Sequence, residues 1–149
     1  MGIELGAFSV SLSVANIEAS LSFYEKLGFA QSGGDPGENW AIMRNGEHVI
    51  GLFSRMFAGN MLAFNPRWGR TARELETFTD IRDIRKELRA KGLVVEGEFD
   101  ETTSGPASFI VVDPDGNPIF VDQHVWAFVA WAWLRLIGTA AFAALRRAA

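Results

Sequence analysis

The sequence predicts an α+β domain in which two similar βαβββ modules form one cupped mixed sheet, followed by a hydrophobic C-terminal helix. Three observations carry this prediction: a strand-like alternation over residues 8–14, the hairpin-forming pair Asn45-Gly46, and helix signals that recur 64 positions apart. With 149 residues, of which 48% are hydrophobic, the chain can bury one core but hardly two. We therefore expect one domain over residues 1–124 and an extension over residues 125–149.

The first module is expected over about residues 8–64, and it begins with a strand and a helix. Along residues 8–14 the polarity alternates, which places the apolar side chains on one face of a strand and three hydroxyl groups on the other, those of Ser9, Ser11 and Ser13. Asn16 is a favourable N-cap for a helix over residues 17–27, and Gly28 ends this helix.

The rest of the first module is read as extended chain. A short extended piece and a Gly/Pro-rich loop over residues 33–37 precede two strand-like runs, 40–44 and 48–53, which Asn45-Gly46 joins as a hairpin. Residues 61–64 are expected to extend the sheet.

The second module, over about residues 72–124, is predicted to repeat this order. A strand is expected over residues 73–79 and a helix over residues 81–91, with Asp80 as its N-cap and Gly92 as its end. Both caps and both end signals lie 64 positions from their counterparts in the first module, which indicates an internal repeat.

Extended chain follows the second helix as well. We expect an extended piece at residues 93–95, a strand over 108–112, a turn over 113–117 and a last strand over 119–122. In the strand at 73–79, a shift of one residue in the register would place Glu74 in the cup instead of Arg73, because neighbouring side chains of a strand face opposite sides.

Composition excludes several classes of function. The formal net charge of −4 and the pI near 5.2 provide no basic stripe for nucleic acid. The absence of cysteine excludes disulfides, a thiolate nucleophile and a cysteine-based metal site, and it fits a reducing compartment. The first residues do not have the pattern of a signal peptide, so a cytoplasmic location is expected.

Two motifs give the chain a resemblance to a known family. Residues 23–29, Phe-Tyr-Glu-Lys-Leu-Gly-Phe, and residues 113–117, Asp-Pro-Asp-Gly-Asn, resemble the vicinal oxygen chelate superfamily, which includes glyoxalase I, bleomycin-resistance proteins and extradiol dioxygenases. The resemblance covers about residues 8–124. It implies a concave sheet that holds a divalent metal, usually by His or Gln on the first strand, His on the fifth and Glu on the last. The corresponding positions here are Ser9, Arg73 and Phe120, which are not such ligands.

The first functional hypothesis is therefore a small-molecule-binding or resistance-type protein of this superfamily that uses no metal or other cofactor. Its pocket is expected to be lined by seven side chains, those of Ser9, Ser11, Ser13, Trp40, Arg73, Phe120 and Asp122. The serines would supply hydrogen bonds, and Arg73 would pair with an anionic group of the ligand. The alternative for the serines is an ordinary solvated strand face.

The second hypothesis is a metal-dependent lyase or dioxygenase of glyoxalase type, with ligands at shifted positions. Glu74, Asp122 and His124 would then hold Ni, Zn, Fe or Mn, and His48 is a further candidate.

A third hypothesis depends on the C-terminal extension. Residues 125–145 contain a single charge, Arg135, and two arginines follow at 146–147. One interpretation is a helix that covers apolar surface on the domain or on a second subunit of a homodimer. The others are membrane contact through residues 125–147, which would make the chain a membrane-tethered interaction domain, and a tail foreign to the domain.

Overall fold

The computed structural model of the chain describes residues 2–71 and 73–124. This part forms a single seven-stranded mixed sheet with two α-helices and one short 3₁₀ helix. In chain order the elements are β1 (Ala7–Val14), α1 (Ile17–Lys26), β2 (Ala30–Asp35), η1 (Pro36–Glu38), β3 (Trp40–Asn45), β4 (His48–Ser54), β5 (Met61–Asn65), α2 (Ile81–Ala90), β6 (Ala107–Val112) and β7 (Pro118–Gln123). The predicted α+β class is confirmed.

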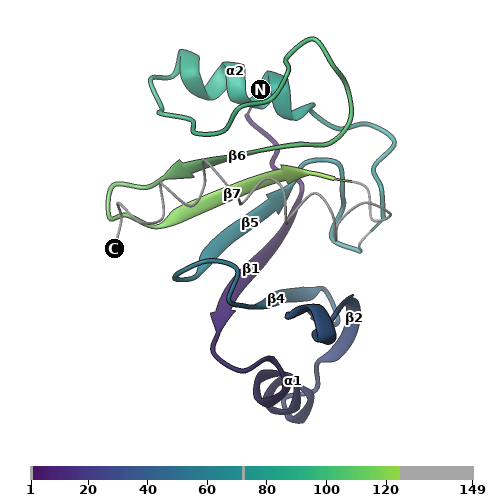
Figure 1. Cartoon of the computed structure of the whole chain (residues 1–149). Coiled ribbons are helices and arrows are strands. Elements are labelled where there is room, and N and C mark those ends of the chain that lie inside the picture. Colours follow the sequence, from purple (N-terminus) through teal and green to yellow (C-terminus); the bar gives the residue numbers. More distant parts are fainter. Residues whose placement is uncertain (1, 72, 125–149) are drawn as a thin grey trace.

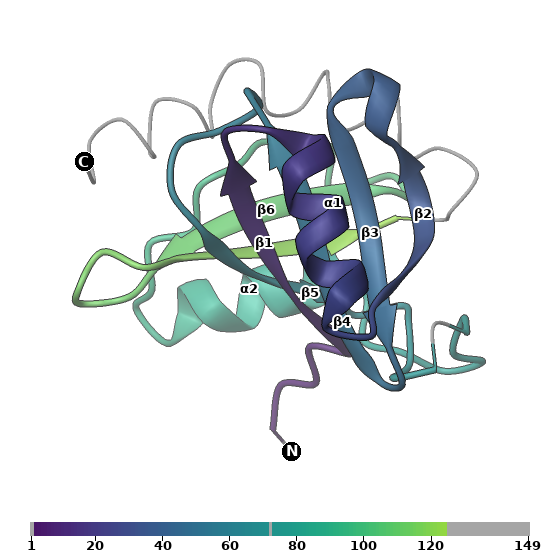
Figure 2. The ribbon, with the colours of Figure 1, turned by 90° about the horizontal axis from the view of Figure 1, so that it is seen from below.

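The sheet is built from two halves that meet at its centre. Its strand order is β2-β3-β4-β1-β5-β7-β6. The central neighbours β1 and β5 are antiparallel, whereas β1 is parallel to β4 and β5 is parallel to β7. Figure 1 shows the resulting strong curvature, with α1 and α2 at opposite ends of the molecule, and Figure 2 shows α1 lying across its half of the sheet. Both helices therefore cover the outer face and leave the inner face as a cup.

The two helices follow the predicted repeat. Their bounds, Ile17–Lys26 and Ile81–Ala90, are offset by the same interval as the predicted caps. The Asn16 side chain accepts a hydrogen bond from the N–H of Ala19, and the Asp80 side chain accepts one from the N–H of Arg82. Gly28 and Gly92 have φ values of 87° and 85°, the left-handed conformation that ends a helix.

The prediction of a strand over residues 73–79 is wrong. Apart from an isolated bridge between Glu74 and Trp68, these residues are irregular. The strand that pairs in parallel with β7, as β1 does with β4, is β5. The error has a physical reason: two residues connect β1 to α1, but a long loop over residues 66–80 connects β5 to α2, so the helices keep the repeat interval and the strands do not.

Residues 93–95, where an extended piece is expected, form no strand of the sheet. Leu93 and Val94 are 46% and 77% exposed, and the only ladder contact near them is the bridge between Glu96 and Ile110. The second module is thus βαββ with one additional bridge.

The predicted C-terminal helix lies outside the described residues. Within residues 2–71 and 73–124, no helix has the length and apolar character needed to span a bilayer.

Alternation along the strands separates an outer core from the cup. On β7, Val121 and Gln123 face α2, while Phe120 and Asp122 face inward. The outer side chains form two clusters, one under each helix. A third cluster lies on the inner face and consists of Trp40, Phe53, Phe57, Met61, Ile110 and Phe120. The cup therefore has an apolar base.

The Asp-Pro-Asp-Gly-Asn motif is the turn between β6 and β7. Asp113 Oδ1 accepts hydrogen bonds from the N–H groups of Asp115 and Asn117, and its Oδ2 accepts one from the Asn117 side chain. The bonds from Asn117 hold the pKa of Asp113 below its ordinary value. This motif sets the register of the last two strands.

Candidate functional site

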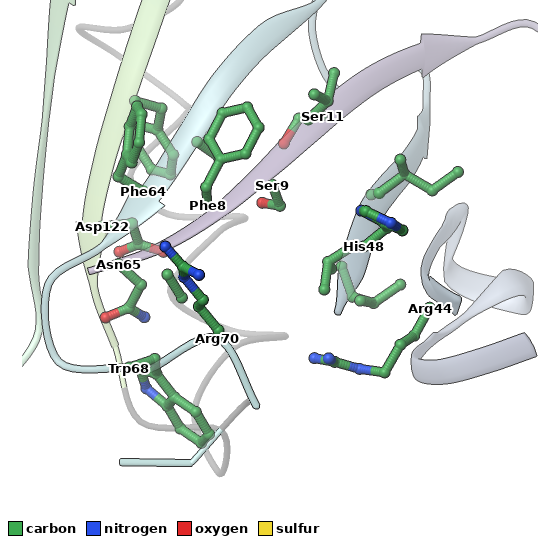
Figure 3. A pocket seen from close by; sticks show the side chains of 18 of the residues that line it. Phe8, Ser9, Ser11, Arg44, His48, Phe64, Asn65, Trp68, Arg70 and Asp122 are labelled. Atoms are coloured by element: carbon green, nitrogen blue, oxygen red, sulfur yellow. The ribbon is translucent and has the colours of Figure 1, made fainter. Parts of the chain in front are cut away.

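The cup contains a cavity of about 580 Å³ on the inner face of the sheet. One wall comes from β3 and β4, the base from β1 and β5, and the other wall from β7 and the loop that follows β5. Figure 3 shows side chains from these separate strands facing the same open space. A cavity of this size suits a small organic molecule.

A row of three paired residues crosses the base of the cup. Ser9 on β1 is the register partner of Ala63 on β5, and Ala63 is the register partner of Phe120 on β7. Ser9 and Phe120 are the first-strand and last-strand metal positions that the sequence resemblance implies. Neither the hydroxyl, the methyl nor the phenyl group in this row is a normal ligand for a divalent cation.

Other registers do not supply the missing ligands. The inward residues of β5 are Met61, Ala63 and Asn65, and Asn65 Oδ1 is already bonded to the N–H of Arg67. In the part of the chain that the structure describes, no group of three or more His, Asp and Glu side chains is arranged to hold a metal ion. The residues present therefore do not fit the superfamily's metal.

Aromatic side chains form the apolar wall of the cup. The rings of Trp40 and Phe53 are stacked, with centroids 6.4 Å apart and an interplanar angle of 5°, and Phe57 packs against Phe53 with centroids 5.3 Å apart. The Phe53 ring lies over Gly51, where a Cβ atom would come within 2.4 Å of the Phe53 Cε2 atom. The glycine thus leaves the space that this ring occupies.

A polar group lies at the end of β7. His124 Nδ1 is 2.6 Å from Asp122 Oδ2 and 3.2 Å from Asn65 Nδ2, while Trp68 Nε1 donates a 2.8 Å hydrogen bond to the His124 carbonyl oxygen. The shorter contact assigns the Nδ1 proton to the bond with Asp122, because a carboxylate accepts and an amide NH₂ only donates. An imidazole held by a carboxylate in this way has the arrangement of a proton donor or acceptor.

Charged side chains surround the mouth of the cavity. Arg44 on β3, Glu47 and His48 at the β3–β4 hairpin, and Arg70 in the loop after β5 all contribute to its lining. Sequence reasoning missed Arg44 and Arg70. The alternation of β3 places Arg44 on the same face as Trp40, a signal that could have identified it, but Arg70 lies in an irregular loop that has no periodicity to use.

Five of the predicted pocket residues line the cavity, and two do not. The five are Ser9, Ser11, Trp40, Phe120 and Asp122. Ser13 is outside the lining because its Oγ donates a 2.8 Å hydrogen bond to the carbonyl oxygen of Phe57. Arg73 is exposed in the loop, so it takes no part in the cavity.

The three ligands of the predicted shifted metal site are not brought together. His124 and Asp122 are in contact, but Glu74 is exposed, is absent from the cavity lining and forms an ion pair with Arg67. His48 lines the opposite wall, on β4.

Comparison with protein families gives one match that covers most of the chain. The model of the Glyoxalase/Bleomycin resistance protein/Dioxygenase superfamily matches residues 6–121. No curated protein sequence matches the chain.

Solved structures of similar fold come from proteins of different activities. A glyoxalase/bleomycin resistance protein/dioxygenase superfamily member from Vibrio splendidus is 18% identical, with a TM-score of 0.55 over 78% of this chain and 97% of that one. Methylmalonyl-CoA epimerase from Streptomyces coelicolor is 13% identical, with a TM-score of 0.53 over 82% of this chain and 99% of that one. An extradiol ring-cleaving dioxygenase from B. fuscum is 20% identical, with a TM-score of 0.51 over 83% of this chain and 34% of that one. At these identities the likeness establishes the fold alone.

Proposed function

Because the chain belongs to the glyoxalase/bleomycin resistance protein/dioxygenase superfamily, we propose that it is a binding or resistance-type member that holds a small molecule in its cup without the superfamily's metal. The observation that carries this proposal is the row of Ser9, Ala63 and Phe120 across the cup. Three neighbouring strands present there side chains that do not coordinate a divalent cation, and they border a cavity large enough for a ligand.

The lining indicates how such a ligand would be held. Trp40, Phe53 and Phe120 offer apolar surface for its body. Hydroxyl groups of Ser9 and Ser11 and the carboxylate of Asp122 offer a small number of hydrogen-bonding groups that would orient it. This combination of apolar walls and a few polar groups is typical of ligand sites.

Binding in the cup is tested with a neutral fluorescent probe, N-phenylnaphthylamine, added to the full chain. We expect saturable binding, and we expect Ala63→Trp to abolish it, since an indole at this position fills the centre of the base. Ala19→Trp places the same side chain on an exposed position of α1 and serves as the control. Equal binding by Ala63→Trp and the wild type would contradict the proposal, and so would a wild-type chain that binds neither this probe nor its sulfonated analogue, anilinonaphthalene sulfonate.

The metal-dependent lyase or dioxygenase remains the competing function, and metal analysis separates the two. The purified chain is incubated with nickel, zinc, manganese or iron(II), passed through a desalting column and assayed for metal content. We expect no stoichiometric metal. Stoichiometric metal that is lost in Asp122→Ala and His124→Ala would overturn the proposal in favour of a site at the end of β7.

We also propose that the chain forms a homodimer in the cytoplasm, with residues 125–149 covering apolar surface on the domain or on the second subunit. This proposal is supported by the exposed apolar side chains of the domain, of which Phe8, Phe23 and Leu27 are at least half exposed. Light scattering of the full chain tests the dimer. Recovery of the chain in the membrane fraction of cells would favour the membrane-tethered alternative.

A further inference from the structure

The charged mouth of the cup points to the chemical class of the ligand. We propose that the cup binds an amphipathic anion, namely a flat apolar or aromatic body with a carboxylate, sulfonate or phosphate group that Arg44 and Arg70 contact. This inference rests on the proposed function, because it names the kind of small molecule that the same cavity takes.

The two arginines stand on separate walls of the cavity. Arg44 belongs to β3, and Arg70 belongs to the loop that follows β5. In Figure 3, Arg44 projects from one side of the opening and Arg70 lies on the other side, close to Asp122 in this view. A charged group at the mouth would thus be approached from two sides while the rest of the ligand occupies the cup.

Neither guanidinium has an acidic partner within the described part of the chain. Arg44 Nη1 donates a single long hydrogen bond of 3.4 Å to the Gly46 carbonyl oxygen, and Arg70 forms no side-chain hydrogen bond or ion pair there. Arg67, in the same loop as Arg70, is by contrast paired with Glu74. A guanidinium group carries five donors in a planar arrangement that matches the oxygens of carboxylate, sulfonate and phosphate groups.

Two carboxylates also line the cavity and have to be considered. Asp122 already accepts the 2.6 Å bond from His124 Nδ1, which occupies one of its oxygens. Glu47 is exposed in the turn beside Arg44 and forms no ion pair within the described residues. Glu47 should therefore weaken the attraction of the mouth for an anion, and its removal should strengthen it.

The base of the cup requires that the remainder of the ligand be apolar. Trp40 and Phe53 present stacked rings, and Phe120 and Met61 complete the inner cluster. Burial of a flat hydrocarbon or aromatic surface against these side chains contributes through the hydrophobic effect and through ring stacking. A fully hydrophilic anion such as free phosphate would leave this surface exposed to water.

A matched pair of probes tests the inference. N-phenylnaphthylamine and anilinonaphthalene sulfonate share one aromatic framework, and only the second carries an anionic group. Fluorescence titration of the full chain gives a dissociation constant for each. We expect Arg70→Gln and Arg44→Gln each to weaken the sulfonate by about five- to tenfold, because each removes a charge-assisted contact, and to change the neutral probe by less than about twofold.

Three further variants sharpen the test. Glu47→Gln should tighten the sulfonate and leave the neutral probe unchanged, the opposite sign to the arginine variants. Arg73→Gln removes an exposed arginine outside the cavity and should change neither probe. Ala63→Trp should abolish binding of both, which shows that the sulfonate occupies the cup and no other apolar patch.

The outcomes separate the two levels of the argument. A selective loss of sulfonate binding in the arginine variants supports the inference. Equal changes for both probes, or none, overturn the inference and leave the proposed function intact. Absence of binding by both probes to the wild-type chain overturns both. Because Arg70 is exposed, Arg70→Gln keeps the test decisive even in the event that Arg44→Gln does not fold.

Discussion

The side-chain oxygen Oε1 of Gln123 accepts a 2.8 Å hydrogen bond from the backbone N–H of Ile81, the first residue of α2. The amide nitrogen of the same side chain donates to Asp80 Oδ2 at 2.9 Å and to the Gly105 carbonyl oxygen at 3.0 Å. Gln123 is 1% exposed and lies on β7, one residue from the inward-facing Asp122. The start of α2 is therefore fixed directly to the strand that forms one wall of the cup.

Replacement of Gln123 by Met should destabilise the domain by about 1–3 kcal/mol, because the buried N–H of Ile81 loses its acceptor and Asp80 Oδ2 and the Gly105 carbonyl oxygen each lose a donor, while the side-chain volume changes little. Denaturant unfolding measures the difference. Gln31→Met is the matched control, since Gln31 is exposed and forms only longer bonds of 3.2 and 3.3 Å within its own strand. A loss in Gln123→Met no larger than that in Gln31→Met would show that this network does not stabilise the fold.

The same network makes stability depend on pH through Asp80. Burial raises the pKa of this carboxyl group, but hydrogen bonds from Gln123 and Arg82 and the charge of Arg82 outweigh burial and hold the pKa below its ordinary value of 3.8. A carboxyl group with a lowered folded-state pKa contributes stability above its unfolded-state pKa, and this contribution is lost as the pH falls through the folded-state value. The free energy of unfolding should thus fall from about pH 5 downward.

Asp80→Asn should make this acid limb shallower, because Asn still caps the helix but does not titrate. The measurement is chemical unfolding at several pH values between about 3 and 6. Asp83→Asn, an exposed change on the same helix, is the control and should leave the wild-type slope unchanged. Identical slopes for Asp80→Asn and the wild type would contradict the role given to this carboxylate.

The parts of this fold that the sequence predicts are those held by contacts between residues close together in the chain. The caps Asn16 and Asp80 contact backbone N–H groups two or three residues away, so their pattern is complete in a short window and predicts both helices. The strand β5 contains only Met61–Asn65, and its pairing with β1 and β7 depends on residues 50 or more positions away. Because a long loop separates β5 from α2, the repeat interval of the helices predicted this strand too late in the chain, at residues 73–79.

The candidate site likewise contains some residues that a local pattern predicts and others that only contacts distant in the chain bring together. Alternation along β1 correctly brought Ser9 and Ser11 to the cup, because a period of two needs no knowledge of other strands. The contact of His124 with Asn65 joins residues 59 positions apart and has no local signal. Ser13 shares the alternation of the other serines, yet its hydroxyl is bonded to the Phe57 carbonyl oxygen, a partner that only the folded chain supplies.

Gly51→Ala should reduce both ligand affinity and stability. A methyl group at this position would come within 2.4 Å of the Phe53 ring, which is 2% exposed and confined by Trp40 and Phe57. The ring has to move toward the cavity, at a cost of about 1–3 kcal/mol in the free energy of unfolding. N-phenylnaphthylamine should bind more weakly as a result.

Phe53→Leu in the Gly51→Ala background provides the internal check, because the smaller side chain leaves room for the new methyl group. We expect it to restore part of the stability that Gly51→Ala loses. Gly2→Ala, at an open position with no atom within 4 Å of the added Cβ, should have no effect on either property. A Gly51→Ala chain with wild-type affinity and stability would show that the Phe53 ring is not confined.

The row of Ser9, Ala63 and Phe120 predicts that metal binding can be built into the cup. In the triple variant Ser9→His, Ala63→His and Phe120→Glu, three adjacent strands present two imidazoles and a carboxylate in one line, the ligand types that the sequence resemblance implies for the superfamily. We expect about one Zn or Ni ion per chain, a number set by one three-ligand site. Metal content after desalting and the metal-dependent rise of the melting temperature measure it.

The three double variants, each with one of the positions left unchanged, should bind more weakly because two ligands do not hold the ion. A triple variant that folds but takes up no more metal than the double variants would show that these three positions do not converge and would remove the support for a metal-free cup.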